Sequence, residues 1–286
     1  MIKKGIILAG GTGTRLSPLT KSVNKQLLPL YDKPLIFYPL SILMLAEIRE
    51  ILIIVNNGQK KNFYNILGDG KRYGIKIKYK IQKKPRGIAE AFILGKKFIK
   101  KDNIALILGD NFFYGQSLTT KLLKAKNHNL GATVFLKKVE NPSSFGVAVI
   151  RNEKITNIIE KPKKFISDKA ITGLYFFDNN VIKVATNIKP SERNELEITD
   201  VLKFYQKNNN LTYEEIGRGA IWSDAGKIED LTNLSNFIYS VEKVQNFKIA
   251  CIDEIAFNQG WIDKRQLKKN IKFYGNCNYS DYLRDI

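Results

Sequence analysis

Residues 5–16 read GIILAGGTGTRL. The first five form a short apolar run without alternation, which is typical of a strand buried on both faces of a parallel sheet. The glycines that follow let backbone N–H groups approach a phosphate without side chains in the way. This order predicts a buried strand that leads directly into a phosphate-binding turn.

The turn matches neither of two well-known phosphate-binding loops. A P-loop requires GxxxxGK[ST], which is absent, and a dinucleotide fingerprint requires glycine where Leu16 stands. Pro18 and Pro29 argue against a long helix directly after the turn. What remains is a glycine-rich loop with Arg15, which can fork onto phosphate oxygens, and Lys25, which acts as a point charge. The alternative for this segment is a surface turn with two solvated cations.

After this turn, apolar stretches of strand length alternate with stretches that have helical periodicity. We expect strands at 51–55, 75–81 and 104–108, and helices at 34–46, 60–67 and 87–99. This rhythm predicts an α/β fold: a Rossmann-like, mostly parallel sheet flanked by helices on both faces.

The pattern changes after residue 110. We expect shorter strands at 132–138, 145–150, 155–159, 173–177 and 211–216, helices at 179–186 and 198–207, and a mainly helical tail from 228. The chain therefore reads as one α/β domain over 1–246 with an inserted sheet region. Residues 247–286 read as a helical C-terminal appendage of the same domain.

The composition excludes several classes of protein. Of 286 residues, 44% are hydrophobic and 26% are charged, as in ordinary globular proteins. No apolar run reaches the ~18 residues of a membrane-spanning helix, and the N-terminus lacks the features of a signal peptide. We expect a cytoplasmic protein without a membrane partner. Cys251 and Cys277 lie outside any CxxC or Cys/His cluster, which argues against a disulfide framework and a structural zinc site.

The net charge of +20 does not by itself indicate nucleic-acid binding. The basic residues are 38 lysines and 9 arginines scattered along the whole chain. Proteins that read nucleic acids favour clustered charge and Arg at base edges. We therefore expect no nucleic-acid partner, whereas an anionic small substrate is compatible with the charge.

Two acids follow apolar strand ends, where open α/β sheets bind their ligands. Asp110 comes directly after the run at 104–108, and Asp224 follows the apolar segment ending at Trp222. Next to a phosphate loop, carboxylate oxygens are natural ligands for Mg²⁺. The alternatives are a helix cap at Asp110 and an unremarkable surface acid at Asp224.

Glu160 and Lys161 end the expected strand at 155–159. An acid next to a lysine at a strand end is usually a solvated pair. The functional interpretation is that Glu160 holds sugar hydroxyls and Lys161 holds a sugar phosphate. The single histidine, His128, lies in a polar stretch, so a Ser-His-Asp triad is not expected.

Together these segments resemble the sugar nucleotidylyltransferases, which join a sugar 1-phosphate to a nucleoside triphosphate. The family motif GGxGTRLxPxTxxxxKxLLP is present from Gly10 to Pro29. The resemblance covers nearly the whole chain, through YDKP at 31–34, LGDG at 67–70, LGDNFFYG at 108–115, EKP at 160–162, TGLYF at 172–176, ELEITD at 195–200 and EIAF at 254–257. Within the family, the sequence is most like the glucose-1-phosphate thymidylyltransferases of dTDP-rhamnose synthesis.

The resemblance implies Mg²⁺-dependent transfer of a thymidylyl group from dTTP to glucose 1-phosphate, giving dTDP-glucose and pyrophosphate. It implies Asp110 and Asp224 as the Mg²⁺ ligands, and Arg15, Lys25, Asp110 and Lys161 as the catalytic residues. The implied nucleotide-binding residues are Leu8, Gly10, Gly11, Gly13, Thr14, Arg15, Lys25, Gln26, Gln82 and Gly87. The implied residues for the sugar phosphate are Asn111, Gly146, Glu160, Lys161 and Ile171.

Some positions depart from the usual pattern of the family. Arg86 stands where Asp is common and Glu90 where Gln is common, both near the expected base pocket. The same reaction with UTP or with another hexose 1-phosphate is therefore an alternative. An alternative of a different class is a catalytically silent regulator that binds sugar nucleotides, although the implied catalytic and metal-binding residues are all present.

The resemblance also implies a homotetramer, with residues 247–286 on its oligomer or regulatory face. It further implies a second nucleotide-sugar site, through which dTDP-rhamnose inhibits the enzyme. The segments matching that site include Gly115, residues 217–219 and residues 254–257. An Arg usually follows the last segment, but Asn258 stands here. We therefore expect the tetramer to persist and the feedback inhibition to be weakened.

Overall fold

The computed structural model describes residues 1–128 and 130–286, and its centre is a parallel sheet. Four strands lie in the order β6 (Ile104–Leu108), β1 (Lys4–Ala9), β4 (Glu50–Asn56) and β5 (Lys76–Gln82), all parallel. The register pairs Leu8 with both Ile54 and Leu108. The carboxyl ends of these strands therefore meet at one edge, where the glycine-rich turn begins.

The sheet continues beyond β6 with antiparallel strands. β11 (Lys169–Phe177) pairs with β6, β8 (Ala132–Lys138) and β9 (Gly146–Arg151), and β9 pairs with β10 (Lys154–Glu160). β12 (Leu211–Ile216) runs parallel to β8. The result is a mixed nine-stranded sheet with a parallel centre, which confirms the predicted fold class.

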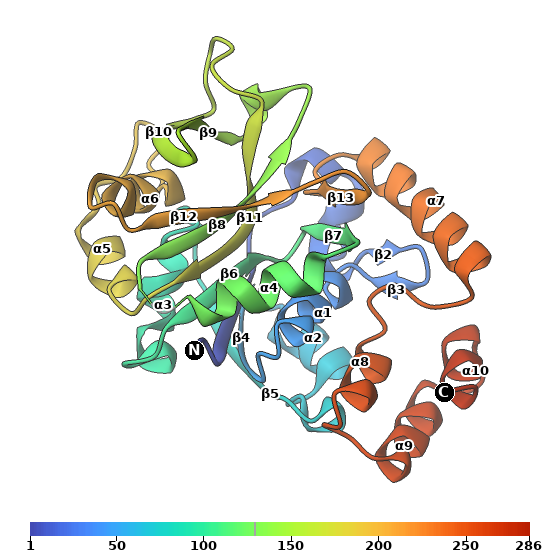
Figure 1. The fold of residues 1–286 in the computed structure, drawn as a ribbon. Helices are drawn as coiled ribbons and strands as arrows, with labels where there is room; N and C mark the ends of the chain where they lie inside the picture. The colour runs from blue at the N-terminus through green and yellow to red at the C-terminus, as the bar shows by residue number, and fades with distance from the viewer. Residues whose placement is uncertain (129) are drawn as a thin grey trace.

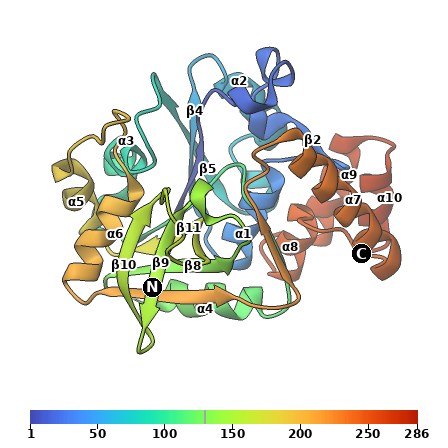
Figure 2. The same cartoon turned by 90° about the horizontal axis from the view of Figure 1, so that it is seen from above.

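Helices cover both faces of this sheet, as Figures 1 and 2 show. Neighbouring residues of β1 point to opposite faces, so Ile7 joins one buried apolar cluster and Ile6 joins the other. The helices before β8 are α1 (Phe37–Leu45), α2 (Lys60–Leu67), α3 (Glu90–Ile99) and α4 (Leu118–Asn127), and those after β11 are α5 (Val181–Asn187) and α6 (Ile198–Lys207). α1, α2 and α4 cover the Ile7 face, while α3, α5 and α6 cover the Ile6 face.

The C-terminal part of the chain is helical, as expected. It comprises α7 (Ile228–Gln245), α8 (Ile252–Asn258), α9 (Lys264–Tyr274) and α10 (Asn278–Arg284), drawn in orange and red in Figure 1. Asp253 is buried between the last three helices, where it accepts hydrogen bonds from the hydroxyls of Tyr274 (3.0 Å) and Tyr279 (2.9 Å). Burial raises the pKa of this carboxyl. Ile252 and Leu267 belong to the same apolar cluster as Ile7, so these helices pack onto the sheet domain.

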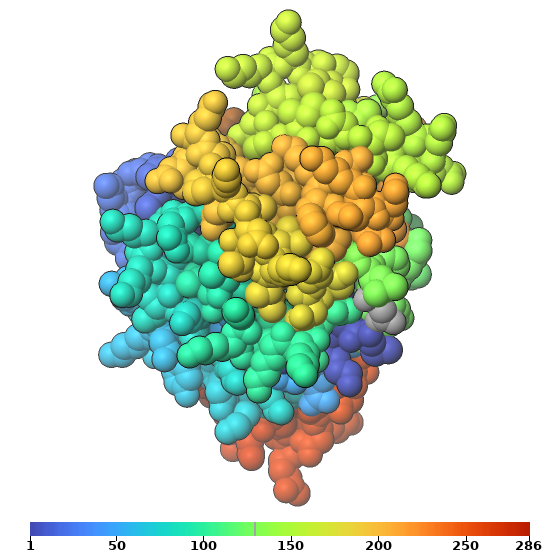
Figure 3. Space-filling view, turned by 90° about the vertical axis from the view of Figure 1, so that its left-hand side faces the viewer, coloured from blue at the N-terminus to red at the C-terminus, as the bar shows by residue number. Residues whose placement is uncertain are grey.

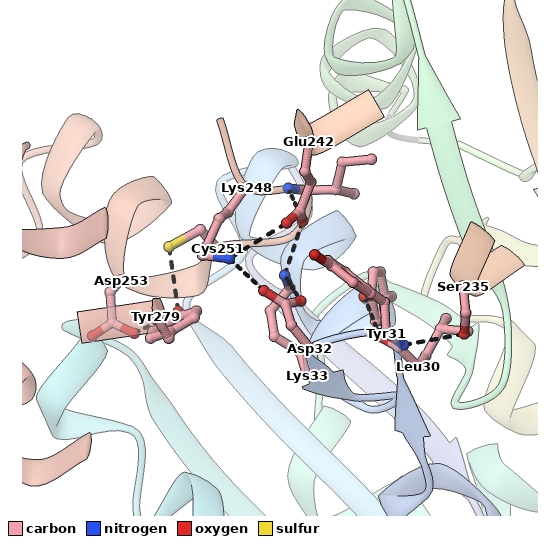
Figure 4. Close-up of polar contacts among 12 residues, drawn as sticks. Leu30, Tyr31, Asp32, Lys33, Ser235, Glu242, Lys248, Cys251, Asp253 and Tyr279 are labelled. Atoms are coloured by element: carbon pink, nitrogen blue, oxygen red, sulfur yellow. Dashed lines mark hydrogen bonds and ion pairs between the residues drawn. The ribbon is translucent and has the colours of Figure 1, made fainter. Parts of the chain in front are cut away.

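A partly buried ionic cluster joins α7 to the segment that follows the glycine-rich turn (Figure 4). A short hairpin of β2 (Pro29–Leu30) and β3 (Lys33–Pro34) carries Asp32 and Lys33. Lys33 is only 2% exposed, and its Nζ lies 3.1 Å from Glu242 Oε1 in addition to pairing with Asp32. Lys248 pairs with both acids. We call Asp32, Lys33, Glu242 and Lys248 the hairpin cluster.

Several element boundaries differ from the expected ones. The helix expected over 34–46 begins only at Phe37, because Pro34 pairs with Pro29 in the hairpin. The helix expected from 87 begins at Glu90, and the strand expected from 145 begins at Gly146. The strand end expected before Asp224 is that of β13 (Ala220–Ser223). Its partner β7 (Phe112–Gly115) was not expected, and the two strands form a small separate sheet.

The space-filling view shows which of these segments lie next to one another on one face of the molecule. Figure 3 shows the yellow surface of the α5 and α6 region next to the green-blue surface of α3, with the yellow-green β9–β10 region projecting at the top. Within residues 1–128 and 130–286, no helix has both the length and the apolar character needed to cross a bilayer.

Candidate active site

The glycine-rich turn after β1 is held by the neighbouring strand β4. Asn56, the last residue of β4, accepts a hydrogen bond from Gly11 N (3.0 Å) and donates one to Gly11 O (2.6 Å). Thr20 Oγ1 donates to Gly13 O (2.8 Å), and Gly13 has a left-handed backbone with φ of 60°. Three short 3₁₀ turns follow at Thr14–Leu16, Leu19–Lys21 and Lys25–Leu27. The loop is therefore fixed without the long helix that Pro18 argued against.

The two cations expected to bind phosphates lie next to the two expected metal ligands. Lys25 Nζ lies 2.6 Å from Asp110 Oδ2 and donates to the backbone oxygen of Asp224 (3.2 Å). Arg15 is more exposed, and its Nη2 lies 3.9 Å from Asp224 Oδ2. Lys25 therefore contacts one residue that is 85 positions away in the sequence and another that is 199 positions away.

The two carboxylates form a site that suits a hard cation. Burial raises the pKa of Asp224, and the charge of Asp110 raises it further. A divalent cation relieves this repulsion, and Mg²⁺ favours a few carboxylates plus phosphate and water oxygens. The described residues include no group of three or more His, Cys, Asp or Glu side chains arranged to hold a metal. The remaining ligands would therefore come from substrate oxygens and water.

A cavity of about 240 Å³ opens next to these acids. It brings together residues from both halves of the sheet, among them Arg15, Asp110, Asn111, Gly146, Glu160, Lys161, Ile171, Gly173, Tyr175, Thr199, Trp222 and Asp224. Every residue expected to bind the sugar phosphate lines this cavity. Strand pairing explains part of this arrangement, because Gly146 of β9 lies opposite Glu160 of β10. A side chain at 146 would begin 3.2 Å from Glu160 Oε2, so glycine leaves room at the carboxylate.

Asn111 connects the acid site to the floor of the cavity. Its Nδ2 donates to Asp110 Oδ1 (2.9 Å), while its Oδ1 accepts from Gly173 N (3.0 Å) and Trp222 Nε1 (2.7 Å). Asn111 is completely buried. These bonds link the end of β6 to β11 and to β13, and so they fix where Asp110 points.

Arg193 is a functional candidate that the sequence reasoning missed. Its Nη2 lies 3.2 Å from Glu160 Oε1 and 2.9 Å from Glu197 Oε1. Burial raises the pKa of Glu160, and the charge of Glu197 adds to the rise. The nearby segment at 195–200 was part of the family resemblance, but no periodicity places Arg193 next to Glu160.

Of the expected base-binding residues, Gln82 contacts the glycine-rich turn and Gly87 contacts Leu196. Gln82 is buried at the end of β5, and a Cβ added at Gly10 would lie 2.0 Å from its Oε1. Gly87 has φ of 96°, and a Cβ there would lie 2.4 Å from Leu196 O. As formed by the described residues, neither the 240 Å³ cavity nor a second one of about 640 Å³ includes Gln82 or Gly87.

The other expected nucleotide-binding residues surround the turn. Gly11, Thr14 and Lys25 line the larger cavity together with Asn56. Leu8 O accepts from Gly109 N (2.9 Å), which joins the ends of β1 and β6. Gln26 is buried, and its Oε1 has no partner among the described residues.

The raised pKa of Glu160 predicts a pH effect on sugar-phosphate binding. The carboxylate, as an acceptor, is the form that binds hydroxyl groups, and its proton is retained up to a higher pH than at an ordinary Glu. We expect the KM for the sugar phosphate to rise as the pH falls, beginning above the usual Glu range near about 4.3. The measurement is KM against pH for the wild type and for Glu160→Gln. The phosphate titrates in both proteins, so identical profiles would refute the role of Glu160.

Comparison with known proteins agrees with this geometry. Residues 4–241 match the family model described as nucleotidyl transferase. The chain therefore belongs to the nucleotidyl transferase family. It is 48% identical to the glucose-1-phosphate thymidylyltransferase of Neisseria meningitidis serogroup A, over 98% of each chain. It is 42% identical to that of Mycobacterium tuberculosis, over 99% of this chain and 98% of the relative.

Solved structures show the same likeness. A Bacillus anthracis protein described as a glucose-1-phosphate thymidylyltransferase, crystallised with sucrose, superposes with a TM-score of 0.76 at 40% identity, covering 82% of this chain and 94% of that one. A UDP-glucose pyrophosphorylase complexed with UDP-glucose gives a TM-score of 0.73 at 26% identity, covering 84% and 99%. The predicted family membership is confirmed.

Proposed function

We propose that this protein transfers a thymidylyl group from dTTP to glucose 1-phosphate, giving dTDP-glucose and pyrophosphate. The observation that carries the proposal is the convergence of Arg15, Lys25, Asp110 and Asp224 at the mouth of the cavity that contains Glu160. The relatives of similar length that carry this activity in their names support the choice of substrates. We also propose that this reaction is the first step of dTDP-rhamnose synthesis.

The residues of this chain position the two substrates and balance the negative charge of their phosphates. The sugar phosphate oxygen attacks the α-phosphorus in line and pyrophosphate leaves, so no covalent intermediate with the protein is needed. The glycine-rich turn and Arg15 hold the triphosphate, and Lys25 balances charge on its phosphates. Lys161 binds the sugar phosphate, while Glu160, which is paired with Arg193, accepts hydrogen bonds from sugar hydroxyls. Holding both substrates together removes much of the entropic cost of the reaction.

A divalent metal is general in this family, and we propose that Mg²⁺ is the ion bound here. Asp110 and Asp224 would hold it, and Asn111 orients the first of these acids. When bound, Mg²⁺ stabilises the negative charge that develops on the α-phosphate and the pyrophosphate. The repulsion that raises the pKa of Asp224 supports the fit between this pair and a cation.

The direct test measures pyrophosphate release over a grid of nucleoside triphosphates and sugar 1-phosphates. We expect dTTP with glucose 1-phosphate to give the highest kcat/KM. UTP should retain activity, because one methyl group in an apolar pocket is worth only ~1–3 kcal/mol. A kcat/KM for UTP equal to that for dTTP would remove the thymidylyl specificity and keep the reaction class. No release with any pair would favour a sugar-nucleotide-binding regulator.

The two outer cations should affect different substrates. Arg15→Lys should weaken turnover of dTTP, because lysine lacks the planar fork that grips phosphate oxygens. Lys161→Ala should instead raise the KM for glucose 1-phosphate. Both proteins should keep the melting temperature of the wild type, because Arg15 is exposed and Lys161 lies at the cavity. Identical defects for both substrates in the two variants would contradict this division of roles.

We further propose a homotetramer whose second nucleotide-sugar site lies near α8. Asn258 is the exposed last residue of that helix. A positively charged side chain is favoured at a helix C-terminus and can pair with a diphosphate. The side chain of Asn258 has neither a positive charge nor the guanidinium group of an arginine. Asn258→Arg should therefore tighten inhibition by dTDP-rhamnose without changing the mass of the assembly. Asn62→Arg, at an exposed position of α2, is the control that adds the same charge elsewhere. Equal inhibition curves for all three proteins would refute this assignment.

A further inference from the structure

We infer that Lys33 and Glu242 are positioning residues, which hold two groups of the active site in place from outside it. Their ion pair clamps helix α7, which begins just after Asp224, to the segment that carries Lys25. As the described residues form them, the cavities of about 240 and 640 Å³ are lined by neither member of this pair. The inference rests on the proposed function, because it assumes the roles given to Lys25 and Asp224.

The segment 25–33 lies alongside α7. Hydrogen bonds join the two at intervals, from Lys25 Nζ to Asp224 O (3.2 Å), from Tyr31 N to Ser235 Oγ (3.2 Å) and from Lys33 Nζ to Glu242 Oε1 (3.1 Å). Figure 4 shows the last two of these bonds, near the middle and the end of the helix. The partners follow in the same order along both segments, so each segment can fix the other over its length.

Apolar side chains pack between the same two segments. One buried cluster contains Leu28 and Leu30 from the segment and Leu231, Leu234 and Ile238 from α7. Within residues 1–128 and 130–286, no residue of α7 belongs to either of the two clusters that flank the sheet. The placement of α7 therefore depends on this separate cluster and on the ion pair at its end.

The position of Asp224 depends on α7. This acid lies in the turn between β13 and the start of the helix at Ile228. The next residue, Ala225, is completely buried in the cluster that α7 shares with Leu28, and its backbone has φ of 43°. A residue with a Cβ adopts this left-handed conformation only rarely, so the surrounding packing must hold it there. A shift of α7 therefore moves Asp224 relative to Lys25.

Glu242 fixes the other end of α7. Its Oε1 accepts hydrogen bonds from Lys33 Nζ and from Ile249 N (2.8 Å). Its Oε2 lies 3.4 Å from Lys248 Nζ. Between these partners, Asn246 has a left-handed backbone with φ of 55°, at the point where the helix ends. The carboxylate therefore ties the end of the helix both to the hairpin and to the chain that follows.

The length of α7 explains how a distant ion pair can affect the active site. The helix has 18 residues, which makes it ~27 Å long. A tilt of about 5° around its middle displaces each end by about 1 Å. A displacement of this size among reacting groups can cost about 10²-fold in rate. The sugar-phosphate residues Gly146 and Glu160 lie on β9 and β10, so a tilt of α7 leaves them in place.

The kinetic test uses Glu242→Gln, which removes the charge and keeps the shape of the side chain. We expect kcat to fall about tenfold, with the KM for glucose 1-phosphate within about twofold of the wild type. Lys33→Met should show the same division between kcat and KM. The double variant should lose no more than the more affected single variant, because both substitutions release one clamp. A wild-type kcat in Glu242→Gln, or additive losses in the double variant, would overturn the inference.

Phe63→Ala is the control for a general loss of stability. Phe63 is completely buried on α2 and is not among the residues that line the two cavities. Its truncation should lower the melting temperature about as much as Lys33→Met does. At a temperature where all variants are folded, Phe63→Ala should keep the kcat of the wild type. An equal loss of kcat in this control would attribute the defect to destabilisation and overturn the inference.

Amide hydrogen exchange separates this inference from the proposed function, because it requires no turnover. In Glu242→Gln, exchange should become faster at residues 26–31 and 229–235 as well as around the substitution. Acceleration confined to residues 239–249 would overturn the inference and leave the reaction untouched. Faster exchange in both segments of a protein that transfers no nucleotide would support the clamp and refute the proposed function.

The wild type provides the same information if Glu242→Gln does not fold. Segments that hold one another open together, with the same dependence on denaturant. We expect the amides of 26–31 and of α7 to exchange through one common opening as denaturant is added. Separate openings of the two segments would overturn the inference.

Discussion

Asp110→Asn is expected to lower kcat by about 10²–10³, the cost of losing one group that stabilises transition-state charge. The carboxylate lies at the end of β6, is oriented by Asn111, and pairs with Lys25 at 2.6 Å. An amide there can no longer balance the charge of Lys25 or hold a divalent cation as strongly. The measurement is pyrophosphate release at saturating dTTP, glucose 1-phosphate and Mg²⁺.

The control for this experiment is another lysine–aspartate pair with the same separation. Asp102 Oδ2 also lies 2.6 Å from a lysine, Lys4, but far along the sheet from the cavity. Asp102→Asn should leave kcat unchanged. If Asp110→Asn keeps the kcat and the melting temperature of the wild type, Asp110 neither binds the metal nor acts in catalysis.

Lys33→Met is expected to reduce the free energy of unfolding by about 3–5 kcal/mol, because it removes the lysine from its buried ion pair with Glu242. Lys33 is 2% exposed and lies between Asp32 and Glu242, whose charges would then be shared with Lys248 alone. The expected drop in melting temperature is on the order of 10 °C. Thermal unfolding followed by circular dichroism measures it.

Lys126→Met is the matched control for burial. Lys126 is also nearly buried, but its partner Glu47 is 45% exposed and can be hydrated when the lysine is removed. We expect a loss of about 1 kcal/mol or less. Equal melting temperatures for the two variants would show that the hairpin cluster contributes no more than a surface pair.

The strands and the acid positions were predictable because local signals specify them. The continuous apolar runs of β1, β4 and β6 match their predicted positions within one residue, since strands buried on both faces lack polar positions. Asp110 follows one of these runs, so its place at the ligand-binding edge follows from topology alone. The glycine-rich turn was equally clear, because its composition serves a local backbone requirement.

The remaining parts depend on contacts that the pattern of a single segment does not reveal. Helix α1 begins at Phe37 because Pro34 belongs to the hairpin of β2 and β3. The helical periodicity of the sequence does not reveal this strand pairing. The strands β7 and β13 pair with each other across more than a hundred residues of sequence. Arg193 meets Glu160 only once α6 packs near β10. Arg86 and Glu90 each looked like an isolated departure, and only the fold shows that they bind one another.

The ion pair between Lys25 and Asp110 defines the state of the active site before substrates bind. Each acid at the cavity mouth already has a basic neighbour, Lys25 for Asp110 and Arg15 at a longer distance for Asp224. If Asp110 holds a divalent cation as proposed, substrate arrival would be an exchange of partners rather than the capture of an anion by a bare positive centre. Lys25 would then be released from the carboxylate of Asp110 and would be able to pair with a phosphate. We expect anions that bring no metal to gain little by this exchange, so the resting pair would favour the complete nucleotide–metal complex.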